Sequence, residues 1–211
     1  MLAGMASSSR DRSRAVSPAI SDAVLDAAER VLLQVGWDGL SLERVASAAG
    51  LSRATAWRRG VNRDALIDAL VNRLGADYQR QMWPVLVALD PVADRLRSAV
   101  AALWRVVETH LPLVLASDSV FHQNSSQSVN FTDPFVKLVE EGQANGTLRP
   151  EGAARDVAAA IFNTACWPYV HLRGHHDWPA DKAERLVGGL LLGGLFAEAP
   201  AAANGQELDR S

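Results

Sequence analysis

The chain has 211 residues, enough to bury a large core without disulfide bonds or metals, and its single cysteine, Cys166, has no intramolecular partner. Its composition is 48% hydrophobic and 21% charged, as in globular proteins, and no apolar run approaches the ~20 residues that a membrane-spanning helix needs. Residues 1–66 carry nine arginines and seven acids, whereas residues 67–211 carry twelve basic and seventeen acidic residues. These features argue against a membrane-spanning or disulfide-rich protein, fit the reducing cytoplasm, and favour a basic module joined to a mildly acidic domain.

The N-terminal segment is predicted to begin without regular structure and then to form one helix. Residues 1–16 are rich in Ser and Arg and show no hydrophobic periodicity, which predicts a disordered arm. Ser17 followed by Pro18 is a typical helix-start pair. The apolar residues that follow recur at helical spacing, so we expect an amphipathic helix that ends at Gly36.

Two short helices and a longer one are predicted next. Ser41 can cap the first short helix, and Gly50 can end it. Ser52 can start the second, which should end at Gly60, and Asn62 can cap the long helix after it.

The rest of the chain is also helical in pattern. The long helix should reach about Trp83, where Pro84 would end or kink it. Residues 117–130 are polar and indicate a loop, and no segment shows sustained strand alternation. The sequence therefore predicts an all-α protein. Its expected parts are a disordered arm (1–16), a three-helix domain (17–66), a larger helical domain (67–199, with helices near 91–110, 131–144, 152–172 and 181–199) and a frayed tail (200–211).

The two short helices have the pattern of a helix-turn-helix. Glycine at position 50 permits the positive φ that a tight turn between helices needs. Ala46 and Ala49 are small enough for the two helices to approach closely, and Leu51 places an apolar side chain in the angle. In this motif the second helix enters the major groove of DNA.

The second short helix carries side chains suited to that groove. Arginine can contact guanine or grip a phosphate, and threonine can donate to phosphate or meet the thymine methyl group. The alternative is an ordinary helical hairpin with a solvated basic face. The exposed positions are expected to hold Arg53, Thr55, Arg58 and Arg59.

These residues resemble the N-terminal domain of the TetR family of bacterial transcriptional regulators. The resemblance covers about the first third of the chain and rests on an ordered series of features rather than on any one of them. It implies that Arg53, Ala54 and Thr55 face bases and that Ser41, Trp57, Arg59 and Arg63 lie near phosphates. The series runs through Gly36 and Trp37, Ser41, Val45 and Ala46, then Ala49 to Thr55, Trp57 to Arg59, and Asn62 to Leu66.

The chain departs from the family pattern at two positions that are normally in the core. Ala56 stands where a large aliphatic residue is usual, and Gly60 stands where phenylalanine is usual. Losing a buried aromatic side chain costs ~3–5 kcal/mol when nothing fills the space. One alternative is therefore a degenerate relative that keeps the fold and the dimer but binds DNA weakly and serves mainly to bind a small molecule.

By the same resemblance, residues 67–199 should form a domain for ligand binding and dimerisation. The final helix is apolar on more than one face, which favours a homodimer that pairs through the last two helices; the alternative is a central helix of a monomer. Members of this family usually bind palindromic operator DNA and repress transcription, and they release the DNA when a ligand binds.

Aromatic and polarizable residues recur in this larger domain. Apolar walls with a few polar groups would suit a small apolar ligand, although each such side chain could equally serve only to pack the core. The candidate lining residues are Trp83, Trp104, His110, Phe121, Phe162, Asn163, Cys166 and Trp167.

Two other kinds of site are less well supported. His171, His175, His176 and Asp177 are clustered, but Gly174 and the nearby Pro179 favour a solvated loop between the last two helices over a metal site. Cys166 lies in an apolar stretch, and no phosphate-binding glycine loop or nucleophile motif is present, so we expect neither an enzyme nor a cofactor.

Overall fold

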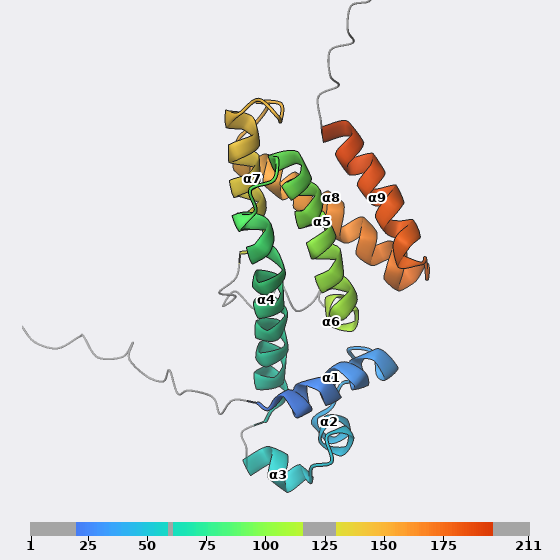
Figure 1. Ribbon diagram of the computed structural model, residues 1–211. Coiled ribbons are helices and arrows are strands. Elements are labelled where there is room, and N and C mark those ends of the chain that lie inside the picture. Colours follow the sequence, from blue (N-terminus) through green and yellow to red (C-terminus); the bar gives the residue numbers. More distant parts are fainter. Residues whose placement is uncertain (1–19, 59–60, 116–129, 196–211) are drawn as a thin grey trace, which may run out of the picture. The chain divides into compact units, whose positions relative to one another are not determined.

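The computed structural model describes residues 20–58, 61–115 and 130–195 (Figure 1). The regular elements in this part of the chain are helices, which confirms the predicted all-α class, and none of them is long and apolar enough to cross a membrane. The predicted arm, Gly60, most of the 117–130 loop and the tail lie outside the described residues. The helices are α1 (Asp22–Val35), α2 (Leu42–Ala48), α3 (Arg53–Arg58), α4 (Arg63–Val87), α5 (Val92–Thr109), α6 (Leu111–Leu115), α7 (Asp133–Ala144), α8 (Ala154–His175) and α9 (Ala180–Leu195).

Helix α1 begins later than the sequence predicted. Ser21 is its N-cap, with an extended backbone (φ −68°, ψ 149°), so Ile20 is outside the helix, and Ser17 and Pro18 lie outside the described residues. The predicted end is confirmed: Gly36 has a φ of 68°, a conformation that costs glycine little.

Helix α4 does not end at Pro84 but continues to Val87. The last carbonyl groups of a helix have no partner within it and need one elsewhere. Arg95 supplies that partner, since its guanidinium donates to the carbonyl oxygens of Val85 (3.1 Å) and Leu86 (2.9 Å) and also pairs with the Glu141 carboxylate. This arginine therefore joins the end of α4 to α5 and α7.

Helix α8 also runs further than predicted. It continues to His175, so His171, Gly174 and His175 are helical rather than part of a loop between α8 and α9. The interior glycine has a packing role, because a Cβ atom on Gly174 would lie 2.2 Å from a methyl group of Leu115 on α6. The prediction of a loop was therefore wrong for His171, Gly174 and His175, whereas His176 and Asp177 do lie in the connection between α8 and α9.

Two compact units make up the chain, and they divide after Leu70. Helix α4 is continuous through the division, and Leu66 and Leu70 are both buried. In the first unit α1 packs on α2, and α2 packs on α3. Its buried residues on α1 and α2 are Val24, Leu25, Ala27, Ala28, Val31, Leu32, Val45 and Ala46.

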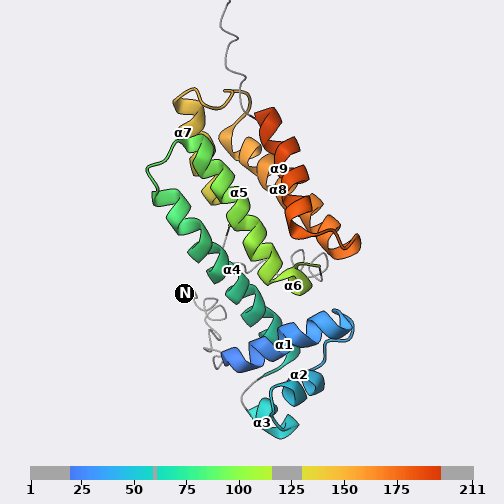
Figure 2. The same ribbon diagram turned by 45° about the vertical axis from the view of Figure 1, so that its right-hand side comes forward.

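Helix α5 is the central element of the second unit, where it contacts α6, α7, α8 and α9 (Figure 2). Helix α8 contacts α6, α7 and α9 in turn. An amphipathic helix surrounded on several sides needs a wide apolar surface. The buried residues of α5 are Val92, Leu96, Ala99, Val100, Ala102, Leu103, Trp104, Val106 and Val107.

Two contacts one helical turn apart join α5 to α8. The Trp104 indole nitrogen donates to the Ala165 carbonyl oxygen (2.9 Å), and the indole stacks on Tyr169. Glu108 accepts from the Tyr169 hydroxyl (2.9 Å) and from two nitrogens of Arg173 (2.5 and 2.8 Å). The hydrogen bonds from Arg173 hold the pKa of Glu108 below its ordinary value.

We predict that Glu108→Gln lowers the free energy of unfolding at pH 7 by about 1–3 kcal/mol, because Arg173 loses its anionic acceptor. The lowered pKa of Glu108 means that the wild-type contact stabilises the fold above the ordinary value of 4.5 and is lost as the pH falls through the lower folded value. Urea unfolding followed by circular dichroism should therefore give a difference at pH 7 that shrinks toward pH 3. A difference that stays constant over this range would contradict the role of the ion pair.

Candidate DNA-binding surface and ligand cavity

The turn between α2 and α3 is built as the sequence predicted. The Ser41 hydroxyl oxygen accepts from the Arg44 backbone N–H (3.3 Å) and caps α2. Gly50 has a φ of 67°, which turns the chain so that the Leu51 N–H donates to the Ala46 carbonyl oxygen (2.8 Å). Both hydrogen bonds satisfy backbone groups at the ends of α2 and fix where α3 begins.

Helix α3 is short and is capped by its own neighbouring residues. The Ser52 hydroxyl oxygen accepts from the Thr55 N–H (3.1 Å) and lies 2.8 Å from the Thr55 hydroxyl. Ala56 is buried, and its carbonyl oxygen accepts from the Val61 N–H (3.1 Å). The small residue at position 56 is therefore on the inner face of the helix, as the family pattern implied.

The basic side chains of this surface have partners on α2 and its flanks. Arg53, at the first position of α3, pairs with the Glu43 carboxylate (2.5 Å), and both side chains are largely exposed, at 76% and 63%. The Arg44 guanidinium donates to the Gly39 carbonyl oxygen (2.6 Å). The sequence analysis did not predict the ion pair between Arg53 and Glu43. The helix-turn-helix pattern could have indicated it, because this motif brings α2 beside α3.

The remaining predicted DNA contacts are placed as follows. Ala54 and Arg58 are exposed on α3, and Thr55 is half-buried. The Arg63 guanidinium lies over the ring of Trp37, 5.4 Å from the centroid, at the start of α4. The side chain of Trp57, and Arg59 as a whole, lie outside the described residues.

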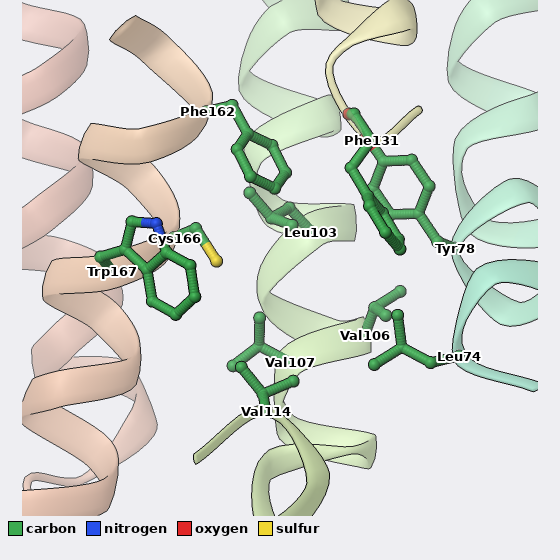
Figure 3. Close-up of a pocket in the computed structure, with 10 residues that line it drawn as sticks. All are labelled: Leu74, Tyr78, Leu103, Val106, Val107, Val114, Phe131, Phe162, Cys166 and Trp167. Atoms are coloured by element: carbon green, nitrogen blue, oxygen red, sulfur yellow. The ribbon is translucent and has the colours of Figure 1, made fainter. Parts of the chain in front are cut away.

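A cavity of about 200 Å³ lies within the second unit (Figure 3). Helices α4, α5, α6 and α8 surround it together with Phe131, which lies just before α7. Aliphatic side chains from α4, α5 and α6 form one part of its wall, and aromatic rings form much of the rest. The lining residues are Leu74, Tyr78, Leu103, Val106, Val107, Val114, Phe131, Phe162, Cys166 and Trp167.

The few polar atoms on the described wall either donate hydrogen bonds within the protein or belong to an uncharged thiol. The Tyr78 hydroxyl donates to the Phe131 carbonyl oxygen, and the Trp167 indole nitrogen donates to the Asn163 side-chain oxygen (3.1 Å). Burial raises the pKa of the Cys166 thiol to about 12, so it stays protonated at neutral pH. The wall therefore offers an apolar surface without a charge.

Three of the predicted ligand residues, Phe162, Cys166 and Trp167, meet at this cavity. Trp104 instead faces α8 and α9, and His110 is buried with its Nε2 3.2 Å from an Asp77 carboxylate oxygen. Asn163 and Trp83 are exposed, and Phe121 lies outside the described residues. The aliphatic lining residues and Tyr78 were not predicted as ligand contacts. Their helical spacing is the same as that of residues that only pack a core, so the sequence does not distinguish the two roles.

The glycines of α9 divide into an inward and an outward set. A Cβ atom on Gly188 would lie 3.1 Å from the Trp104 ring, whereas one on Gly189 or Gly193 would meet nothing within 4 Å. Leu190 lies on the same outward face and is 82% exposed, and Leu186 beside it is also exposed. These outward residues recur at positions 186, 189, 190 and 193, which form one stripe on a helix.

We predict that Gly50→Ala lowers the free energy of unfolding by about 1–2 kcal/mol, because the positive φ at this turn is costly for a residue with a Cβ atom. No neighbouring atom would clash, so the cost comes from the backbone alone. Gly50→Asn is the matched control and should lose less, since asparagine tolerates this conformation. Urea unfolding that places both variants at the wild-type midpoint would contradict this assignment.

Comparison with known proteins places these features in a family. Residues 24–70 match the model of the bacterial regulatory proteins of the tetR family. An uncharacterised helix-turn-helix transcriptional regulator of Mycobacterium tuberculosis is 33% identical over 87 residues, which are 41% of this chain and 43% of that relative. The match thus spans less than half the length of the relative.

Solved structures share the fold over most of the chain. A protein of unknown function from Rhodococcus sp. RHA1 is 26% identical, with a TM-score of 0.64 over 83% of this chain and 94% of that one. A ketosteroid transcriptional regulator of Mycobacterium tuberculosis is 17% identical, with a TM-score of 0.67 over 86% of this chain and all of that one. Residues 24–70 therefore match the helix-turn-helix domain of the tetR family of bacterial regulatory proteins, and the chain shares its all-α fold with these solved structures.

Proposed function

We propose that this protein is a ligand-responsive transcriptional regulator, a repressor that binds palindromic operator DNA as a homodimer in the cytoplasm. A small apolar molecule in the cavity releases it from DNA. The observation that carries the proposal is the exposed, capped helix α3, whose outer face presents Arg53, Ala54 and Arg58. The proteins it resembles are regulators rather than enzymes.

The ion pair between Arg53 and Glu43 does not prevent DNA binding. An ion pair between two exposed side chains is worth only ~0–1 kcal/mol, whereas a good arginine contact to a base is worth ~1–3 kcal/mol. Exchange of the Glu43 carboxylate for a guanine edge or a phosphate is therefore favourable. Before binding, the carboxylate keeps the Arg53 guanidinium near the start of α3.

We predict that Arg53→Ala weakens DNA binding about ten- to a hundred-fold, because one base or phosphate contact is lost. Glu43→Gln should tighten binding by less than about five-fold, because it removes only a weak ion pair and one negative charge. The measurement is fluorescence anisotropy with the duplex that the wild-type protein selects from a random-sequence pool.

Arg97→Ala is the matched control, since Arg97 is an exposed, ion-paired arginine on α5 in the second unit. Equal losses for Arg53→Ala and Arg97→Ala would contradict the assignment of α3. If the wild-type protein selects no duplex and its affinity does not fall with salt, the protein is the degenerate relative that the buried Ala56 favours.

The outward face of α9 supports the homodimer. Leu186 and Leu190 are exposed apolar side chains, and the open Gly189 and Gly193 would let a second helix approach closely. Trp167 and Pro168 are exposed on α8, which packs beside α9. A two-fold dimer could place two copies of α3 ~34 Å apart, the spacing of successive major grooves.

We predict that Leu190→Glu converts the homodimer to a monomer, because a buried interface cannot accommodate an unpaired carboxylate. The fold should survive, since Leu190 is 82% exposed within the subunit. Leu33→Glu is the control, because Leu33 is a similarly exposed leucine (75%) on α1. Multi-angle light scattering at micromolar concentration that finds a dimer for Leu190→Glu would overturn the proposed interface.

The cavity supports the ligand response. Leu74 and Tyr78 on its wall belong to α4, the same continuous helix that begins with Arg63 in the first unit. A ligand that shifts these two side chains would act directly on that helix. By analogy with the family, the change would alter the separation of the two recognition helices in the dimer and so their fit to successive grooves.

A further inference from the structure

A second hollow adjoins the apolar cavity and differs from it in chemistry. It has a volume of about 260 Å³, and its lining residues are Val114, Leu115, Trp167, Val170, His171 and His175. Val114 and Trp167 line both spaces, so the two spaces adjoin at these side chains. Among the described residues, the apolar cavity is lined by uncharged side chains, whereas the second hollow has two imidazoles.

The two imidazoles give the second hollow side chains that can bind an anion. His171 and His175 lie one turn apart in the last part of α8, and their exposed rings carry N–H groups that can donate to a carboxylate. The Nε2 atoms of His171 and His176 are 3.0 Å apart, within hydrogen-bond distance.

The rest of the lining gives an anion no competitor. Among the residues described for the two hollows, none is acidic. The nearby Arg173 is paired with Glu108 and does not line this hollow. The imidazoles are therefore the side chains that would bind a polar group there. In the part of the chain that the structure describes, no group of three or more His, Cys, Asp or Glu residues is arranged to hold a metal.

We propose that the two hollows bind one amphipathic monocarboxylate, with its hydrocarbon part in the apolar cavity and its carboxylate at His171 and His175. This inference rests on the ligand response proposed above and names its chemical class. A cavity of ~150 Å³ holds benzene, so the apolar cavity has room for roughly eight carbon atoms. The close approach of α6 to α8 at Gly174 brings Leu115 to the wall beside the histidines.

The test compares decanoate with 1-decanol, which has the same chain and no charge, by isothermal titration calorimetry on the full-length protein. We expect wild type to bind decanoate at least about ten-fold more tightly, because charge-assisted hydrogen bonds are the strong ones. The double variant His171→Gln, His175→Gln should lose this preference and keep the wild-type affinity for 1-decanol. Unchanged binding of 1-decanol also shows that the variant is folded.

Lys137→Gln is the control for net charge, since Lys137 is exposed on α7 and lines neither hollow. It should leave the decanoate preference unchanged. Equal binding of decanoate and 1-decanol by wild type would overturn the carboxylate assignment but leave the apolar ligand site standing. Failure of both compounds to bind would count against the inference and the proposed ligand response together. ZnCl2 binding that the double variant loses, without any decanoate preference, would assign the histidines to a metal instead.

Discussion

The contact between the α5 carboxylate of Glu108 and the Arg173 guanidinium of α8 is the constraint on which the second unit depends. Together with the Trp104 indole one turn earlier, it fixes the spacing of two long helices at two points on matching faces. Residues next to these contacts on the same two helices line the cavity: Leu103, Val106 and Val107 of α5 and Phe162 and Cys166 of α8. A cavity in a packed interior persists only where such contacts prevent collapse.

The cavity and the hollow beside it have different surfaces: the described wall of the cavity is apolar, and the hollow contains the polar imidazoles of His171 and His175. In the cavity, the Tyr78 hydroxyl and the Trp167 indole already have acceptors, so a ligand there gains mainly from removal of its apolar surface from water. The imidazoles lie beyond Trp167, at the end of α8. If the proposed ligand binds here, an uncharged wall next to a polar hollow would select it by where its polar group lies along the molecule.

The first unit follows a different principle, since its function requires exposed charge rather than burial. Hydrogen bonds around Gly50 and Ser52 hold the start of α3 in place. Arg53 and Arg63 make only weak contacts, with the Glu43 carboxylate and the Trp37 ring. Contacts of this strength orient a side chain without competing with DNA for it.

Local signals in the sequence determined the helices, their glycine ends and the helix-turn-helix. Gly36, Gly50 and Asn62 act through the backbone conformation or hydrogen bonds of their immediate neighbours, so their positions are readable without the fold. The same holds for the family pattern of the first unit, which is a series of such signals.

Only the tertiary structure decided where helices continue past local stop signals and which apolar residues surround empty space. Pro84 did not end α4, whose last carbonyl groups accept hydrogen bonds from Arg95 of α5, and Gly174 did not end α8, where it leaves room for Leu115 of α6. Trp104 and Trp167 look alike in sequence, yet one is held against α8 and the other lines the cavity. Helical spacing assigns a side chain to a face, but the partner of that face comes from elements far away in the chain.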